Sequence, residues 1–548
     1  MVPIRFSISA TFGLGTCFFA AAKVEKNSIF AALKLIMGII IRQSIKGTLV
    51  NYLGVAVGFI TTFFVLTHYL TAEEVGLTRV LIDAAVLFSS FAQLGTSSSI
   101  IRFFPYFKDE EGKNHGFFFW TLIVPVVGFL IFLLVLLLFK QPIVNMFSEK
   151  SPLFVNYFRF VIPISLFMLY ETVFEANANV LMRIVIPKMV REVGVRVGLL
   201  VGYLLYGFHY ISLDGLVISF CITYFLAALI DILYLFSLQK ISLKPDLKFI
   251  TKPMLRDILF YTLFLILAAI AGNITPLLSS FFVSAQMGLM YTGIFAIANY
   301  IATVIEIPNR SLNAIANPKI AEAIKEQDFK RAESLCKNVS LHLLLTSVIV
   351  FYIIWINVDL MFRILPNGDQ YEAGKSVILI LGFARLSNST FLVGASALNY
   401  SKYYYLSLVF TLLLTVSAVV LNVVLVPVMG MNGAALANFL SYFVYYLFLL
   451  ILLKWKLNIS VFSKNQLKVI ALVVVLYWIN FLWMKTLTPI VTHVQSHVMA
   501  VAVVEGVVRT CVMMVLCVFL TYIYKISPEV NSLIEKALAK VGGWKTIS

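Results

Sequence analysis

Charged and amide side chains inside long apolar runs are the residues of this sequence most able to do chemistry. Arg385 lies near the middle of one such run, in the stretch GFARLSNST, and Asn388 follows it within one helical turn. A guanidinium group is permanently charged and can hold phosphate oxygens through two parallel hydrogen bonds. Arg385 and Asn388 are therefore candidates to bind an anionic substrate. The alternative, an ion pair between helices, is left open by the sequence.

Two carboxylates share one face of another apolar run. Glu171 and Glu175 are four residues apart, so both project from the same side of a helix. Neighbouring carboxylates in a medium of low dielectric constant resist ionising together. This pair is therefore a candidate site for H+ or Na+ and for coupling to an ion gradient. The alternative is a salt bridge to Arg183 at the inner membrane surface.

Three further groups complete the set of charges within the apolar runs. Asp83 could line a substrate cavity or pair with Arg159, and Arg159 could also extend outward to water. Glu505 and Arg509 are four residues apart and can neutralise one another. Glu306 stands at a predicted helix end, where we expect it to be solvated.

The sequence shows no recognisable motif for metal binding, redox chemistry or catalysis. The five cysteines and six histidines show no ligand spacing, so we expect no metal and no cofactor. No catalytic motif is recognisable, and no loop is long enough for a soluble catalytic domain. The sequence therefore predicts a protein that is not an enzyme.

The elements that position these charges are membrane helices. Of the 548 residues 61% are hydrophobic and only 12% are charged, whereas soluble domains have about 25% charged residues. Runs of 18 or more apolar residues predict transmembrane helices. We expect an all-α polytopic membrane protein with fourteen spans, near residues 47–70, 77–101, 116–139, 154–180, 194–211, 215–238, 257–283, 289–307, 340–362, 375–398, 404–428, 433–453, 468–484 and 499–524.

The distribution of basic residues orients the spans. Of the 42 Lys and Arg residues, six fall in the loops opposite the N-terminus, namely Arg79, Lys140, Lys150, Arg363, Lys375 and Lys485. Cytoplasmic loops carry the excess of Lys and Arg, so both termini are predicted to be cytoplasmic, which requires an even number of spans. The net charge of +16 then reflects contact with anionic lipid, and we expect no nucleic-acid partner.

A weak internal repeat divides the chain into two lobes. Gly76 and Gly288 each precede Leu at a predicted span start, Pro105 and Pro318 follow by about 30 residues, and Gly215 and Gly433 begin later spans. Repeats in the same direction indicate two lobes that rock about a substrate between them. The predicted parts are a cytoplasmic N-terminal segment (1–46), an N-lobe (47–239), a connector (240–256), a C-lobe (257–453), two last spans (454–524) and an amphipathic cytoplasmic tail (525–548).

The N-terminal segment has two possible origins. Arg5, an apolar run and the alanines at 20–22 have the pattern of a signal peptide, whereas Met37 stands where a natural start would directly precede the first span. We favour an over-extended start or a loose cytoplasmic tail.

Four stretches, together with the span count, resemble the polysaccharide repeat-unit flippases of the multidrug/oligosaccharidyl-lipid/polysaccharide superfamily. They are residues 73–77 (EEVGL), 101–107 (IRFFPYF), 317–321 (NPKIA) and 422–438 (NVVLVPVMGMNGAALAN), and the resemblance covers residues 37–524. It implies flipping of undecaprenyl-pyrophosphate-linked oligosaccharides across a bacterial inner membrane for O-antigen, capsule or exopolysaccharide synthesis. Implied partners are this lipid-linked substrate, membrane lipid, H+ or Na+, and the polymerase and glycosyltransferases of the same pathway. The resemblance also implies a groove for a lipid tail between the last two spans, beside Glu505 and Arg509.

One departure from that family concerns the seventh span. Its relatives often hold an acidic residue midway along this span, where this chain has Asn273, Thr275 and Pro276. The alternatives to the flippase are a multidrug exporter of the same fold, which would need twelve spans, and a flippase for the peptidoglycan lipid precursor. A membrane glycosyltransferase or polymerase is a further alternative of a different class.

Overall fold

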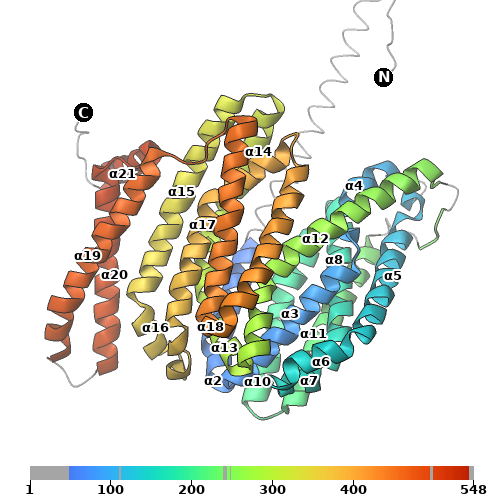
Figure 1. The fold of residues 1–548 in the computed structure, drawn as a ribbon, viewed down its shortest axis with the longest axis horizontal. Coiled ribbons are helices and arrows are strands. Elements are labelled where there is room, and N and C mark those ends of the chain that lie inside the picture. The colour runs from blue at the N-terminus through green and yellow to red at the C-terminus, as the bar shows by residue number, and fades with distance from the viewer. Residues whose placement is uncertain (1–48, 110–112, 239–242, 247–248, 494–497, 542–548) are drawn as a thin grey trace, which may run out of the picture.

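The structure is a computed structural model that describes residues 49–109, 113–238, 243–246, 249–493 and 498–541. Every secondary-structure element in these ranges is helical, which confirms the all-α prediction (Figure 1). The predicted N-terminal segment, residues 1–46, lies outside the described residues.

The helices have the lengths and compositions of membrane spans. Among the described residues, eleven helices could each cross a membrane, and the stretch Tyr405–Leu457 is 53 residues long. This stretch is interrupted at Gly430, whose φ of 59° lies outside the range of a right-handed helix. The stretch therefore holds two of the predicted spans. The chain is therefore a multi-pass membrane protein, and the total of fourteen spans stays a prediction.

Two bundles, a linking helix and a peripheral group make up the molecule. The first bundle, the N-lobe, holds the span Leu49–Tyr69, which includes η1 (Thr61–Leu66) and α2 (Thr67–Tyr69). It continues with α3 (Ala72–Ala92), α4 (Thr96–Phe107), α5 (Phe117–Leu138), α6 (Lys140–Ser148), α7 (Pro152–Tyr157), α8 (Val161–Val180), α9 (Val185–Met189), η4 (Val190–Gly194), α10 (Val195–Gly207) and α11 (Leu213–Ser237).

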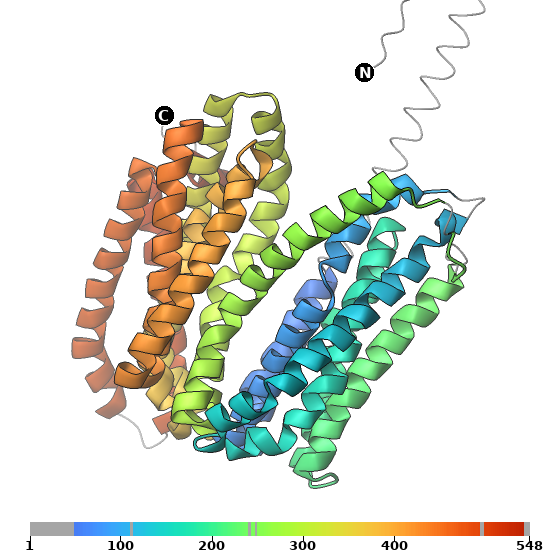
Figure 2. The ribbon, with the colours of Figure 1, turned by 45° about the vertical axis from the view of Figure 1, so that its right-hand side comes forward.

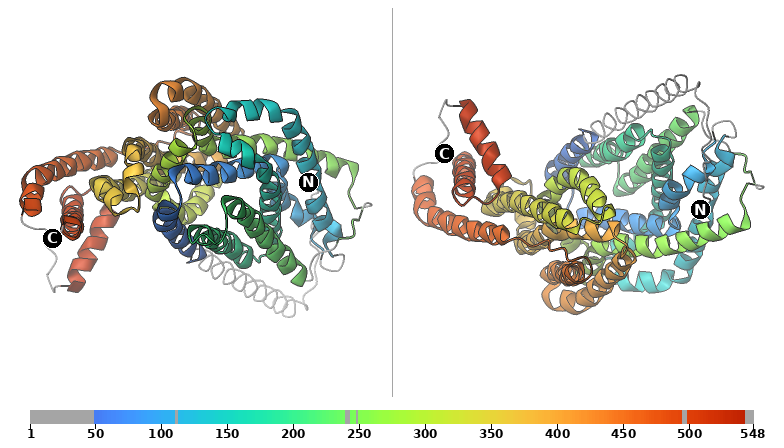
Figure 3. Two further views of the ribbon diagram at one scale, coloured as in Figure 1. Left: turned by 90° about the horizontal axis from the view of Figure 1, so that it is seen from below. Right: turned by 90° about the horizontal axis from the view of Figure 1, so that it is seen from above.

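The second bundle, the C-lobe, follows the linking helix α12 (Lys252–Met287). It contains α13 (Leu289–Thr303), η5 (Val304–Glu306), α14 (Ile307–Lys325), α15 (Phe329–Ile356), α16 (Val358–Ile364), α17 (Lys375–Tyr400) and α18 (Tyr405–Leu452). The peripheral group is α19 (Lys464–His493), α20 (Val498–Ile523) and α21 (Pro528–Val541). Figure 3 shows this group at one edge of the molecule, next to α15 and away from the N-lobe.

Local sequence explains where these helices begin. Thr71 caps α3 through a reciprocal pair of hydrogen bonds with Glu74, the arrangement known as a capping box. Ser212 caps α11, and Thr251 caps α12 with Pro253 in its first turn. Each of these capping residues lies in a predicted loop. Their side chains therefore accept hydrogen bonds from the first backbone N–H groups of the helices at the membrane surface.

The internal repeat is visible as two broken spans. In the N-lobe, α3 and α4 are separated by Leu94 and Gly95, both with positive φ, and in the C-lobe the short helix η5 separates α13 from α14. Pro105 and Pro318 lie inside the second part of each broken span. The helix α14 begins at Ile307, with Pro308 in its first turn.

The linking helix α12 contacts both lobes. Near its start, Thr262 hydrogen-bonds Ser99 of α4 at 3.0 Å. Further along, Thr275 hydrogen-bonds Thr415 of α18 at 2.9 Å, and Ser284 accepts a hydrogen bond from Ser151, just before α7. Figure 2 shows α12 running from the outer edge of the N-lobe to the centre of the molecule. A relative movement of the lobes must therefore bend or tilt this helix.

The lobes touch most closely where α3 crosses α13. A Cβ atom on Gly76 would lie 1.9 Å from the carbonyl oxygen of Leu289, and one on Gly293 would lie 1.9 Å from the carbonyl oxygen of Ala72. These two clashes are reciprocal, so Gly76 corresponds in space to Gly293 rather than to Gly288, the match drawn from the sequence. Only glycine permits this backbone approach, as small residues do in other membrane-helix crossings.

Alanine at either glycine should therefore disrupt the crossing. Gly76→Ala and Gly293→Ala each force the two backbones apart, and overpacking of this kind costs about 1–3 kcal/mol. We expect both variants to lower the melting temperature of the purified protein in detergent.

Gly194→Ala is the matched control, because the nearest atom to its added methyl group would be 3.9 Å away. Equal melting temperatures for all three variants would contradict the assignment of the crossing.

Candidate functional site

A cavity of about 390 Å³ lies where the two lobes meet. Its lining comes from the first span, α3 and α10 of the N-lobe and from α13 of the C-lobe. The lining residues are Gly58, Thr61, Thr62, Leu66, Val75, Thr78, Arg79, Ile82, Arg196, Leu199, Tyr203, Ala296, Ile297, Asn299, Tyr300 and Thr303. Two arginines, four threonines and one asparagine give it polar groups, in a protein whose spans are mainly apolar.

Two π-helical segments flank this cavity. Thr61, Thr62 and Leu66 belong to η1, and Arg196 stands two residues after the end of η4. A π-helical turn inserts an extra residue into a helix and changes the direction of the following side chains, and such turns are frequent at functional sites. Both turns therefore help to aim polar side chains between the lobes.

Arg196 is held across the first span. Its Nη1 donates to the carbonyl oxygen of Gly54 at 2.7 Å, and its Nη2 donates to Glu192 at 3.1 Å. A Cβ atom on Gly58 would lie 2.7 Å from Nη1, so the absence of a side chain there makes room for the guanidinium group. Arg196 keeps about a third of its side chain exposed, with 31% accessible.

Arg79 is the second cavity arginine. Its Nε donates to Asp83 at 3.0 Å, one turn further along α3. The Asp83 side chain is 3% exposed, whereas that of Arg79 is 37% exposed. Asp83 thus neutralises Arg79 from behind and leaves the cation facing the space between the lobes. The predicted pairing of Asp83 with Arg159 is wrong, because Arg79 is its partner.

Arg385 lies one side chain away from the cavity. Its Nη2 donates to Asn299, which lines the cavity, at 2.9 Å, and its Nη1 lies 3.5 Å from Glu306. Asn388 donates to the same carboxylate at 2.6 Å and accepts a hydrogen bond from Tyr446. The geometry is that of the inter-helix ion pair, the alternative that the sequence left open. The expectation of a solvated Glu306 is wrong, since its side chain is 19% exposed.

The carboxylates of α8 lie deeper in the N-lobe. Glu175 accepts a hydrogen bond from Arg191 of η4, so Arg191 takes the place expected for Arg183. Glu171 is 5% exposed, and its Oε1 atom has no hydrogen-bond partner within the described part of the chain. The two predicted ion-coupling residues therefore differ, because Glu175 is partly buried and paired with Arg191, whereas Glu171 is buried.

The remaining predicted residues lie away from the cavity. Arg159 is exposed, with its guanidinium 5.0 Å from the ring centre of Phe160. Arg509 is 4% exposed, lies 3.8 Å from Glu505 and donates to the carbonyl oxygen of Ile356 at 2.8 Å. Trp483 of α19 donates to Glu505 at 3.0 Å. These bonds join α19 and α20 to the end of α15.

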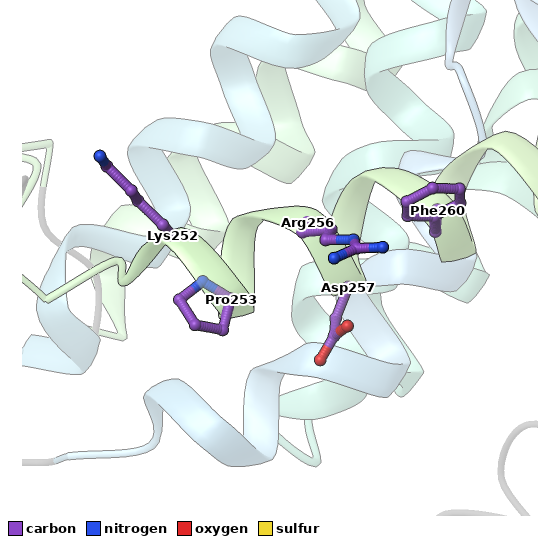
Figure 4. Close-up of a pocket in the computed structure, with 5 residues that line it drawn as sticks. All are labelled: Lys252, Pro253, Arg256, Asp257 and Phe260. Carbon is purple, nitrogen blue, oxygen red and sulfur yellow. The ribbon is translucent and has the colours of Figure 1, made fainter.

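A second, more open cavity lies beside the start of α12. Within the described residues its lining is Lys252, Pro253, Arg256, Asp257 and Phe260, all from this one helix. Figure 4 shows these side chains following one another along α12 and pointing in different directions. The cation of Arg256 lies 5.5 Å from the ring centre of Phe260. Because all five side chains come from one helix, they do not surround a ligand from several helices as the lining of the cavity between the lobes does.

Comparison with known proteins identifies the relatives of this chain. The family model described as "Polysaccharide biosynthesis protein" matches residues 40–317, which is half of the chain. The chain belongs to the polysaccharide biosynthesis protein family. The matched region runs from the first span into α14 and therefore includes all the helices that line the cavity between the lobes. The comparison with curated proteins gave no match.

Solved structures with the same fold are transporters. The lipid II flippase MurJ in an inward-closed conformation is similar with a TM-score of 0.67 and 13% identity, over 86% of this chain and 98% of MurJ. An inward-facing multidrug resistance MATE family transporter of the MOP superfamily is similar with a TM-score of 0.55 and 16% identity, over 77% and 98%. These similarities place the polysaccharide biosynthesis protein in the MATE-like fold.

The sequence of this polysaccharide biosynthesis protein held a signal for its cavity arginines. Arg79 and Asp83 are four residues apart, as are Glu192 and Arg196, and such pairs near span ends can neutralise each other within the membrane. Sequence reasoning treated Arg79 as a loop charge that sets orientation, and so did not assign it to a cavity.

The pairing of Arg385 with Glu306 yields a stability prediction. Glu306→Gln leaves the guanidinium without a counter-ion in a largely buried place, which should cost about 3 kcal/mol. The double variant Glu306→Leu/Arg385→Met should recover much of this loss, since apolar residues can replace a buried ion pair. Melting temperatures in detergent measure both effects.

The matched control is Glu326→Gln, which breaks an exposed pair with Arg331 of α15. A surface pair contributes about 1 kcal/mol or less, so this variant should melt close to the native protein. A native melting temperature for Glu306→Gln would refute a stabilising role for the ion pair.

Proposed function

We propose that this protein flips undecaprenyl-pyrophosphate-linked oligosaccharide repeat units across the bacterial inner membrane, for O-antigen, capsule or exopolysaccharide synthesis. The observation that carries the proposal is the cavity between the lobes, into which Arg79 and Arg196 face. Membership in the polysaccharide biosynthesis protein family supports the class of substrate. The two lobes alternate access to the cavity from either side, as in other transporters built from repeats.

A pyrophosphate group is the part of this substrate that the membrane opposes most. An ionised phosphate in a medium of low dielectric constant loses its hydration, so a carrier must supply compensating cations and hydrogen-bond donors. Guanidinium groups do both, because their planar N–H groups match phosphate oxygens. Arg79 and Arg196 approach the cavity from α3 and α10, two different helices, and so could hold the group from two sides.

Both arginines keep a carboxylate partner behind them. Asp83 neutralises the charge of Arg79, and Glu192 neutralises that of Arg196. These pairs lower the cost of placing two cations within the membrane. An arriving phosphate can share each guanidinium with its carboxylate, because the group has five N–H donors. Release is then possible on the other side, since the carboxylates compete with the substrate for the same cations.

The other predicted residues take supporting roles in this proposal. Arg385 and Asn388 act through Glu306 and Asn299, so they position the cavity wall. The α19–α20 pair, held by Glu505 and Arg509, forms a place for the lipid tail beside α15. Arg159 serves at the outer surface. Coupling to H+ or Na+ through Glu171 and Glu175, contacts with a polymerase and glycosyltransferases, and cytoplasmic termini belong to the same proposal.

A multidrug exporter is the second candidate, and the MATE-like fold favours it. The described lining of the cavity holds two arginines and no carboxylate, so the usual cationic substrates of such an exporter would find no counter-ion there. Lipid II, the substrate named for MurJ, shares a pyrophosphate-linked lipid with the proposed substrate. The chemistry of the cavity therefore favours an anionic substrate over a cationic drug.

Removal of the cavity cations tests the proposal. We compare the charge-neutral double variants Arg79→Gln/Asp83→Asn and Arg196→Gln/Glu192→Gln, which leave no unpaired buried charge. Each should reduce glycan export about tenfold or more, because a hydrogen bond to a charged group contributes about 1.5–3 kcal/mol. Lipid-linked oligosaccharide should accumulate on the cytoplasmic side, measured by extraction and mass spectrometry.

Arg363→Ala is the control, since this exposed arginine in the last turn of α16 lies outside the cavity lining. Immunoblots of membranes verify equal amounts of each variant. Unchanged glycan together with new sensitivity to cationic drugs would exclude the flippase and support the exporter.

A further inference from the structure

Two buried carboxylates of the N-lobe have no role in the cavity described above. Asp231 of α11 is 0% exposed, and within the described residues neither of its carboxylate oxygens has a hydrogen-bond partner. Glu171 of α8 is 5% exposed, and its Oε1 atom likewise has no hydrogen-bond partner within the described residues. The helices α8 and α11 pack side by side in the N-lobe (Figure 1), and the two carboxylates lie within electrostatic range of each other. Asp231 was not singled out from the sequence.

The arginines near this pair form ion pairs with other carboxylates. Arg191 holds Glu175, and Arg196 holds Glu192. The titratable or charged groups that act on Glu171, on Asp231 or on the adjoining hydroxyl of Tyr224 are Glu175 of α8, Arg191 and Glu192 of η4, Arg196 of α10, and Tyr203 of α10. The two arginines of this set, Arg191 and Arg196, are balanced by Glu175 and Glu192. Glu171 and Asp231 therefore add negative charge that no cation of the set balances.

An excess of buried negative charge must be relieved by binding a cation. An ionised carboxylate that is removed from water without a partner costs several kcal/mol, and two close together cost more. We propose that Glu171 and Asp231 form a proton-binding site that couples transport to a proton gradient. This inference rests on the proposed function for the movement that it drives, and deepens it by naming the coupling ion and its site.

The donor set favours a proton over a metal ion. Metal cations bound by oxygen take six or more ligands in the case of Ca2+ or Mg2+. In the described part of the chain, no group of three or more acidic, histidine or cysteine side chains is arranged to hold a metal ion. A proton needs only one carboxylate oxygen, and Glu171 and Asp231 both offer buried oxygens without a hydrogen-bond partner in the described part of the chain.

A short series of electrostatic interactions links this pair with the cavity. Glu171 lies within electrostatic range of Glu192, Glu192 binds Arg196 at 3.1 Å, and Arg196 lines the cavity. A proton on the pair therefore changes the field at a cavity arginine, and a bound anion changes the proton affinity of the pair by the same factor.

The proton balance of the step is simple. A proton leaves the water on one side of the membrane and forms an O–H bond with one carboxylate oxygen of the pair. After the lobes have changed their orientation, that bond breaks and the proton passes to water on the other side. No oxidant, reductant or further reactant is required.

Infrared difference spectroscopy tests the site without any glycan. The full chain in a lipid bilayer, in sodium-free buffer of constant ionic strength, is switched between neutral and acidic pH. We expect a carboxylic-acid carbonyl band that grows on acidification and shifts in D2O. Asp231→Asn and Glu171→Gln should each remove or move this band. Glu505→Gln is the control, because Glu505 already has Arg509 and Trp483 as partners.

Each outcome decides the matter. Absence of the band from the native protein would overturn the proposal, as would spectra of both variants identical to the native one. A native spectrum that responds to added sodium chloride at fixed pH would show a metal-cation site instead. If Asp231→Asn does not elute as a folded protein, Asp231→Glu serves in its place, and the band should persist at a changed position.

The result is independent of the substrate. A proton band in a protein that exports no glycan would leave the site intact and defeat the flippase, whereas normal glycan export without such a band would do the reverse.

Discussion

The need to neutralise charge in a medium of low dielectric constant governs this structure. Arg79, Arg196 and Arg385 each have a carboxylate on a neighbouring turn or helix, and Arg509 has Glu505. The Arg385–Glu306 pair joins two helices and so helps to fix their packing, whereas the other three pairs lie within one helix at four-residue spacing. Polar chemistry between the lobes is possible because the carboxylates hold the cations in place before any substrate arrives.

The linking helix α12 is joined to both lobes by hydrogen bonds. It is fastened to α4 by Ser99 and Thr262, and to α18 by Thr275 and Thr415. Hydrogen bonds between hydroxyl groups are weak enough to exchange, whereas the ion pairs within each lobe are not. Rocking of the lobes can therefore alter the contacts of α12 and preserve the interior of each bundle.

Hydropathy and glycine, proline and basic-residue positions predicted the helical class, most span limits and the internal repeat. They could not predict pairing between distant helices. Arg385 and Glu306 are 79 residues apart, and the residue pattern around Arg385 is equally consistent with a substrate site and with an ion pair. Asp231 escaped notice because a single acid in an apolar run has no pattern; its meaning comes only from Glu171 on the adjacent helix.

The reciprocal contact of Gly76 and Gly293 has a bearing on the origin of the fold. Each glycine faces a carbonyl of the other helix, so the contact surfaces are the same patch used twice, as in an isologous interface. A half-length ancestor with one such glycine would have made this contact with a second copy of itself. Fusion of two copies would then have kept the interface and freed the remainder of each half, α10 and α17 included, to acquire different charges.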